Sequence, residues 1–164
     1  MTVAAATPAI TALLTAGVPH EVLRYQHDPR RQVVGAEAIE EMTRLDGVDP
    51  ARVYKTLVLA LPDGGLGVAI LPVPRELSLK AAAAALGAPK ATLADPDVTE
   101  QATGFAPAAV SPFGQRRPLP TVVDASVLRW ERVLCSSGQR GWIIAVHPQD
   151  LIRLTDAVIA DICA

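Results

Sequence analysis

Lys55 is the residue whose position in the sequence most strongly suggests chemistry. It lies within the run Tyr-Lys-Thr-Leu-Val-Leu-Ala-Leu, whose other members are typical of a buried strand. A lysine in such a strand has two interpretations. Its ammonium either extends to the edge of the sheet to reach water, or faces a bound anion. The run is compatible with both.

A second candidate is the segment 103–124. It begins with glycine, proline and small residues, and it ends in a short apolar run, Thr121 to Val123, followed by Asp124. The first part is too interrupted for a helix or a central strand. A small-residue loop that leads into a buried strand leaves room for a ligand, and such loops often carry function. An ordinary proline-rich surface connection explains the same composition.

The familiar catalytic motifs do not occur in the sequence. Its glycines fit neither a phosphate-binding loop nor a dinucleotide fingerprint, and it has no Gly-x-Ser-x-Gly elbow. The three histidines, His20, His27 and His147, lack the spacing of metal ligands. Cys135 and His147 could form a nucleophile and its base, but they are expected at opposite ends of a hairpin. A core cysteine and a helix-capping histidine are favoured instead.

Length and composition predict one soluble domain over residues 1–164. Half of the 164 residues are apolar and the net charge is −2, which disfavours a protein that coats a polyanion, although a local basic patch remains compatible with nucleic acid. No apolar run is long enough for a membrane span, and the N-terminus lacks a secretory signal. Two cysteines form no disulfide framework, so a cytoplasmic location is expected.

A capping residue followed by proline marks several predicted helix starts, at Thr7-Pro8, Asp49-Pro50 and Asp95-Pro96. Ser78 is a further predicted cap. Apolar periodicity and turn residues predict the other elements, and Pro62-Asp63-Gly64-Gly65 is expected to join two strands in a hairpin. Helices are expected over 8–16, 34–45, 79–86, 96–102 and 148–154, strands over 20–25, 54–61, 66–73, 121–124, 131–135 and 142–146, and short apolar elements over 91–94 and 157–162. This order predicts an α+β domain with a mixed sheet.

Several short segments occur in an order and spacing that are specific when taken together. They are Thr7-Pro8-Ala9, Tyr25-Gln26-His27-Asp28-Pro29, Val53-Tyr54-Lys55-Thr56-Leu57, Leu86-Gly87-Ala88 with Ala94-Asp95-Pro96, Thr103-Gly104-Phe105, Val110-Ser111-Pro112-Phe113-Gly114-Gln115, and the turn containing Ser136, Gly138 and Arg140-Gly141. In these segments the chain resembles the YbaK family of aminoacyl-tRNA deacylases, which are related to the editing domain of bacterial prolyl-tRNA synthetases. The resemblance covers nearly the whole length.

The resemblance implies hydrolysis of the ester between an amino acid and the terminal adenosine of tRNA, without a cofactor. It implies a partly barrel-like mixed sheet flanked by helices. It places Lys55 in the substrate cleft as the catalytic residue. The implied substrate-binding residues are Tyr25, Gly104, Ala108, Ala109, Ser111, Pro112, Ser136 and Gly138. Arg116, Arg117 and Arg140 are candidate tRNA contacts, and prolyl-tRNA synthetase is a candidate partner.

The chain departs from the family pattern in two places. Ala108-Ala109 stands where family members usually carry Gly-Gly, which would reshape or shrink the amino-acid pocket. Ser137 and Gln139 replace a glycine and a lysine, which removes a charge that could meet tRNA.

The resulting hypothesis is a trans-acting deacylase of tRNA mischarged with cysteine or another small amino acid, with tRNA(Pro) as one candidate. An aminoacyl ester is already activated, so backbone N–H donors and a lysine could suffice, with water or a group of the substrate as nucleophile. Two alternatives stay open: a binding module that retains the cleft without catalysis, and a hydrolase of another small activated ester.

Overall fold

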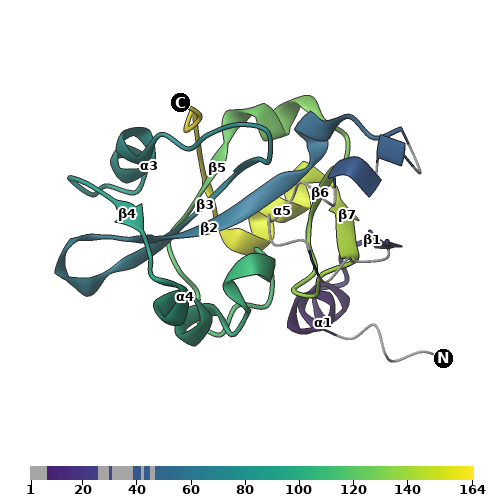
Figure 1. The fold of residues 1–164 in the computed structure, drawn as a ribbon, viewed down its shortest axis with the longest axis horizontal. Coiled ribbons are helices and arrows are strands. Elements are labelled where there is room, and N and C mark those ends of the chain that lie inside the picture. Colours follow the sequence, from purple (N-terminus) through teal and green to yellow (C-terminus); the bar gives the residue numbers. More distant parts are fainter. Residues whose placement is uncertain (1–6, 26–29, 31–38, 42, 45–46) are drawn as a thin grey trace.

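Two β-sheets meet at the start of the long strand β2 (Tyr54–Ala60) in the computed structural model, which describes residues 7–25, 30, 39–41, 43–44 and 47–164 (Figure 1). One sheet has the strand order β4-β2-β3-β5-β8 and the other has the order β1-β7-β6. The remaining strands are β1 (His20–Arg24), β3 (Leu66–Pro72), β4 (Thr92–Leu93), β5 (Thr121–Asp124), β6 (Val133–Ser136), β7 (Trp142–Val146) and β8 (Val158–Ala160).

The β2–β3 hairpin is the longest feature of the larger sheet. Its antiparallel register runs from Tyr54 opposite Pro72 to Ala60 opposite Leu66. The turn between the strands has Asp63 and Gly64 at positive φ, a conformation that Gly adopts freely and Asp tolerates. β5 lies parallel to β3, and β8 lies parallel to β5. The sheet is therefore mixed, as the order of elements predicts.

The two sheets are joined by a parallel bridge between Val53 and Leu134. They do not close into a barrel, because β4 and β8 remain edge strands of the larger sheet. The predicted α+β domain with a partly barrel-like sheet is confirmed. Its division into two sheets is a feature that the sequence pattern does not indicate.

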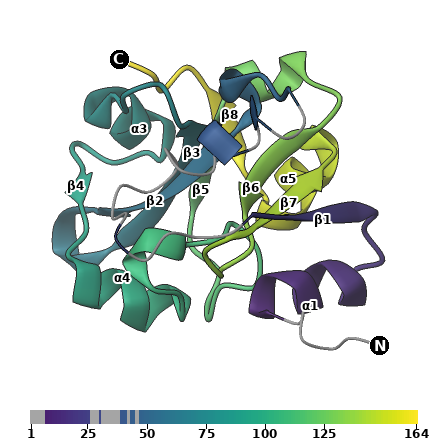
Figure 2. The same ribbon diagram turned by 45° about the vertical axis from the view of Figure 1, so that its right-hand side comes forward.

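Helices cover both faces of the larger sheet (Figure 2). α1 (Pro8–Thr15) and α5 (Pro148–Thr155) contribute Leu13 and Leu151 to one core, while α3 (Leu79–Ala85) covers the second. Ala82 and Ala83 of α3 are buried there, and their small side chains allow the helix to pack closely on the sheet. α4 (Pro96–Thr103) precedes the small-residue loop.

Most predicted capping contacts are present. The side chains of Thr7, Ser78 and His147 accept backbone N–H bonds at the starts of α1, α3 and α5. Asp95 is an exception, since α4 begins at Pro96 as predicted but the Asp95 side chain makes no capping hydrogen bond. The Asp49–Pro50 pair begins only a short 3-10 turn, Pro50–Arg52.

One other prediction differs in extent. β6 begins at Val133, two residues later than predicted, and extends to Ser136. The helix predicted over 34–45 falls largely outside the described residues. Within that range the structure describes 39–41 and 43–44, and these residues are helical. Within the described part of the chain, no helix combines the length and apolarity that crossing a membrane requires.

Candidate active site

The candidate site lies along a stretch of one edge of β2 that no strand of the described residues covers. β4 pairs only with Leu59 and Ala60, and the bridge to β6 is made by Val53. The carbonyl of Val58 accepts the Ala94 N–H at 2.9 Å. Because backbone groups alternate between the two edges of a strand, the N–H and C=O of Thr56 face this same edge. The stretch between Val53 and Val58 therefore presents backbone hydrogen-bonding groups to a cleft.

The cleft has a volume of about 240 Å³ and draws its walls from distant parts of the chain. Its lining comprises β2 with its flanks, the loop after α4 and the turn between β6 and β7: Tyr25, Val53, Tyr54, Lys55, Thr56, Leu57, Val73, Pro107, Ala108, Ala109, Val110, Cys135, Ser136, Gln139, Arg140, Trp142 and Ile143. Six of the residues assigned to the site from the sequence are among them.

Cationic and aromatic side chains stand out in a lining that is otherwise mainly aliphatic. Lys55 and Arg140 are its charged residues, and among the described residues that line it none is acidic and none is histidine. Tyr25, Tyr54 and Trp142 add three aromatic rings in a chain whose aromatic content is only 4%. Such a surface suits an anionic ligand that carries a flat ring. The described residues of the lining offer no carboxylate or imidazole for proton transfer.

Lys55 is half-buried at the rim of the cleft. Its Nζ donates a hydrogen bond of 3.3 Å to the carbonyl of Val73, which also lines the cleft. Burial lowers the pKa of the Lys55 ammonium, and the nearby Cys163 and Glu76 oppose this effect. A cation held with one neutral hydrogen-bond partner and partly removed from water is well placed to bind an anionic group.

The loop and the turn that form the opposite wall are tied together by Ser136. Its Oγ donates to the carbonyl of Ala109 at 3.2 Å and accepts the Gly138 N–H at 3.0 Å. Ala108 and Ala109 belong to a 3-10 turn, Pro107–Ala109, and both line the cleft. The Ala108-Ala109 departure from the family pattern thus lies directly on the cleft wall.

The other predicted substrate-binding residues lie outside the lining and shape its frame. Gly104 ends α4 with φ of 82°, a left-handed conformation that favours glycine. Gly138 has φ of 92°, and a Cβ there would collide with the ring of Phe105. Ser111 is fully buried and accepts the Phe113 N–H at 3.3 Å. Pro112 lines a separate cavity beside α1 and α5.

Of the three candidate tRNA contacts, one lines the cleft and two lie outside it. Arg140 lines the cleft. Arg116 lies against the end of α4, where its Nη1 donates to the carbonyl of Gln101 at 3.2 Å. Arg117 is exposed beside it. Arg116 and Arg117 thus form a basic stretch in the loop that follows the cleft-lining turn Pro107–Ala109.

Cys135 and His147 do not form a catalytic pair. Cys135 is fully buried opposite Ile144, and burial raises the pKa of its thiol to about 12. Nδ1 of His147 accepts the Gln149 N–H at the start of α5. The interpretation of a core cysteine and a capping histidine is confirmed.

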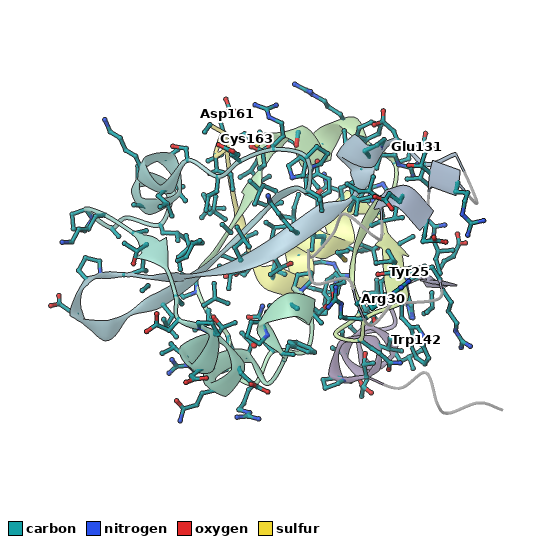
Figure 3. All side chains as sticks on the ribbon, viewed as in Figure 1. Tyr25, Arg30, Glu131, Trp142, Asp161 and Cys163 are labelled. Atoms are coloured by element: carbon teal, nitrogen blue, oxygen red, sulfur yellow. The ribbon has the colours of Figure 1, made fainter. Side chains whose placement is uncertain are left out.

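Sequence reasoning did not assign Thr56 or Trp142 to the site. Trp142 begins β7 beside Tyr25, whose N–H bonds to the Gly141 carbonyl at 2.8 Å, and the two side chains are labelled in Figure 3. The Arg24 guanidinium lies 4.6 Å from the centre of the Trp142 ring. Thr56 follows Lys55 in the family motif, which was the available signal for it.

A family model described as the aminoacyl-tRNA editing domain matches residues 34–154, which include most of this cleft. The chain belongs to the aminoacyl-tRNA editing family. A curated relative from Enterococcus faecalis (strain ATCC 700802 / V583), named "Putative Cys-tRNA(Pro)/Cys-tRNA(Cys) deacylase EbsC", is 30% identical over 129 residues. That alignment covers 79% of this chain and 77% of the relative.

Solved structures share the fold of this editing domain. The crystal structure of "a putative trans-editing enzyme for prolyl tRNA synthetase" has a TM-score of 0.83 at 25% identity, covering 100% of this chain and 99% of that one. The hypothetical protein APE2540 has a TM-score of 0.83 at 24% identity, covering 96% and 100%. The protein is accordingly a hydrolase of the aminoacyl-tRNA ester, in agreement with the resemblance seen in its sequence.

Proposed function

We propose that this editing domain acts in trans to remove cysteine or another small amino acid from mischarged tRNA, with the terminal adenosine and the aminoacyl group bound in the cleft beside β2. The observation that carries the proposal is the composition of that cleft. It joins Lys55 and Arg140 to three aromatic rings and contains no described acidic residue. A nucleotide end attached to a small side chain matches these features.

The two ends of the cleft suit the two parts of the substrate. Lys55 and Arg140 would contact the terminal phosphate or ribose, because a fixed ammonium or guanidinium binds such oxygens well. Tyr25 and Trp142 provide surface on which the adenine ring can stack. The apolar lining of Ala109, with its neighbours Val110 and Cys135, would receive the amino-acid side chain.

The reaction needs little from the protein beyond positioning. Water attacks the ester carbonyl, the bond between the acyl carbon and the ribose oxygen breaks, and that oxygen takes up a proton to leave a free tRNA end. The Thr56 N–H faces the cleft edge and is a candidate donor to the carbonyl oxygen as negative charge develops there. Lys55 would hold the ribose and phosphate in register with that donor.

The proposed substrate also suggests where the protein acts and which macromolecules it contacts. Charged tRNA belongs to cytoplasmic translation, and we place the activity there. We propose tRNA(Pro) as one substrate and prolyl-tRNA synthetase as a candidate partner, because the named activities of similar proteins include both. The exposed Arg117 and the half-buried Arg140 would supply the main tRNA contacts.

The decisive experiment measures release of free amino acid from tRNA charged with cysteine, alanine, serine or proline. We expect turnover of the small aminoacyl groups, and tRNA bodies can be exchanged to test the preference for tRNA(Pro). Lys80 is exposed on α3, so Lys80→Ala serves as a matched control for removal of a lysine. Binding of charged tRNA without release would support the binding module instead. Faster hydrolysis of small esters than of tRNA esters would support the other alternative.

A further inference from the structure

The Thr56 side chain holds an unexplained polar atom at the cleft. Thr56 is 8% exposed, and its Oγ1 is the buried side-chain polar atom that lacks a hydrogen-bond partner within the described part of the structure. A buried hydroxyl without a partner is unfavourable, and most such groups in folded proteins are paired. The family motif brings a threonine here, but no group in the described part of the chain pairs with its hydroxyl.

The surroundings of Thr56 define which end of the cleft it occupies. Side chains alternate along β2, so the Thr56 side chain lies on the same face of the strand as those of Tyr54 and Val58. The Lys55 side chain lies on the opposite face. Tyr54 and Val58 pack in the same core cluster as Val110 and Cys135. Both Val110 and Cys135 line the cleft. Thr56 therefore belongs to the apolar inner end, and Lys55 to the rim.

We infer that the Thr56 hydroxyl hydrogen-bonds the side chain of the bound amino acid and so favours a small side chain with a hydroxyl or thiol over one with only a methyl group. This inference rests on the proposed function and adds to it the residue that discriminates among small aminoacyl groups. A hydroxyl surrounded by apolar side chains penalises a ligand that leaves it unpaired and suits one that pairs with it.

The α-ammonium of the substrate is a poorer partner for Thr56. The described residues that line the cleft include no carboxylate to balance a second positive charge. Placing an ammonium among Ala109, Val110 and Cys135 would therefore cost more than placing a neutral hydroxyl or thiol there. Thr56 lines the cleft and its hydroxyl is buried, so contact with the entering group requires rotation about χ1 or a slight displacement of the side chain.

The test is a cycle of two site variants and two substrates. Thr56→Ser and Thr56→Ala differ from one another only by the hydroxyl, and one tRNA body charged with serine or alanine differs by the same group. We expect the ratio of kcat/KM for the serine ester to that for the alanine ester to be at least threefold higher in Thr56→Ser than in Thr56→Ala. An equal ratio in the two variants overturns the inference.

A third variant separates specificity from stability. Thr56→Val keeps the shape of the side chain and removes the unpaired hydroxyl, so the melting temperature should rise. A purely structural role predicts that rise with an unchanged serine-to-alanine ratio, and that result would also overturn the inference. The inference requires the rise together with a lower ratio. Thr92→Val, at an exposed position of β4, is the matched control and should alter neither quantity.

The outcomes also distinguish this inference from the proposed function. If the wild-type protein releases neither serine, alanine nor cysteine from tRNA, the proposed function fails and the inference fails with it. If the wild type releases them and the Thr56 variants keep its serine-to-alanine ratio, the deacylase proposal stands and only the role of Thr56 is refuted.

Discussion

Replacing Lys55 by methionine separates the charge of its ammonium from the apolar contacts of its stem. The ammonium has one hydrogen bond, to the carbonyl of Val73 at 3.3 Å, and the side chain is half-buried. A hydrogen bond of this kind contributes about 1 kcal/mol, and loss of the cost of partly burying a charge offsets some of that. We therefore expect the melting temperature of Lys55→Met to lie within about 2–4 °C of the wild type.

Activity should respond more strongly than stability. We expect kcat/KM for deacylation to fall at least tenfold in Lys55→Met, which corresponds to about 1.4 kcal/mol of lost transition-state stabilisation. Amino-acid release from charged tRNA measures this change, with spontaneous hydrolysis subtracted. Lys80→Ala should retain wild-type activity because Lys80 is exposed on α3.

The pH profile provides a further check on Lys55. Burial lowers the pKa of this ammonium from its ordinary value of 10.5, so the charge is lost at a lower pH than in a free lysine. Wild-type kcat/KM should therefore decline at alkaline pH, and Lys55→Met should lack that decline. Full activity in a folded Lys55→Met protein, or early unfolding of the variant, would refute a functional role for the charge.

Four other changes test separate features of the protein. Cys135→Ala should remain active in a deacylation assay, since the buried thiol has a pKa of about 12; complete loss of turnover in a folded variant would restore Cys135 as a nucleophile. Reversing Arg116 and Arg117 to Glu should raise the KM for charged tRNA and weaken its salt dependence, and unchanged binding would place the basic contacts elsewhere. Ala108→Gly should widen acceptance toward larger aminoacyl groups by an amount equivalent to about 1–3 kcal/mol, whereas Ala108→Val should narrow it; an unchanged order of substrates would remove Ala108 from the pocket wall. Burial raises the pKa of Asp124, but hydrogen bonds from Ser126 and Ile162 outweigh this effect and lower the pKa overall. The free energy of unfolding, measured with urea, should therefore decrease as the pH falls through that lowered pKa. This acid dependence should be weaker in Asp124→Asn.

Local features of the sequence were sufficient for most elements. Thr7, Ser78 and His147 were readable as caps because a helix start depends on only a few neighbouring residues. The hairpin from Tyr54 to Pro72 was readable because two apolar runs flank a turn with the required glycines. Asp95 shows the limit of such reasoning, since the residue type suits a cap but its side chain makes no capping hydrogen bond.

The family motifs located the site but did not show the role of each motif residue in it. Lys55, Ala108 and Ser136 line the cleft, whereas Gly104 and Gly138 hold the backbone in left-handed conformations beside it. A motif shows that a residue type occupies a position without stating whether the side chain meets a ligand or supports a turn. The two duties separate only when the packing of each residue is known.

Tertiary structure alone decided the shape of the cleft and two of its contributors. Thr56 lines the cleft because no described strand pairs with β2 between its contacts with β6 and β4. Trp142 lines the cleft because β7 pairs with β1. Both conditions depend on pairing between strands far apart in the chain, which no local pattern specifies. The sequence by itself determined which elements form and which family the chain resembles. The pairing of those elements determined which side chains share one cavity, because burial and hydrogen bonding there depend on neighbours that come together only in the folded chain.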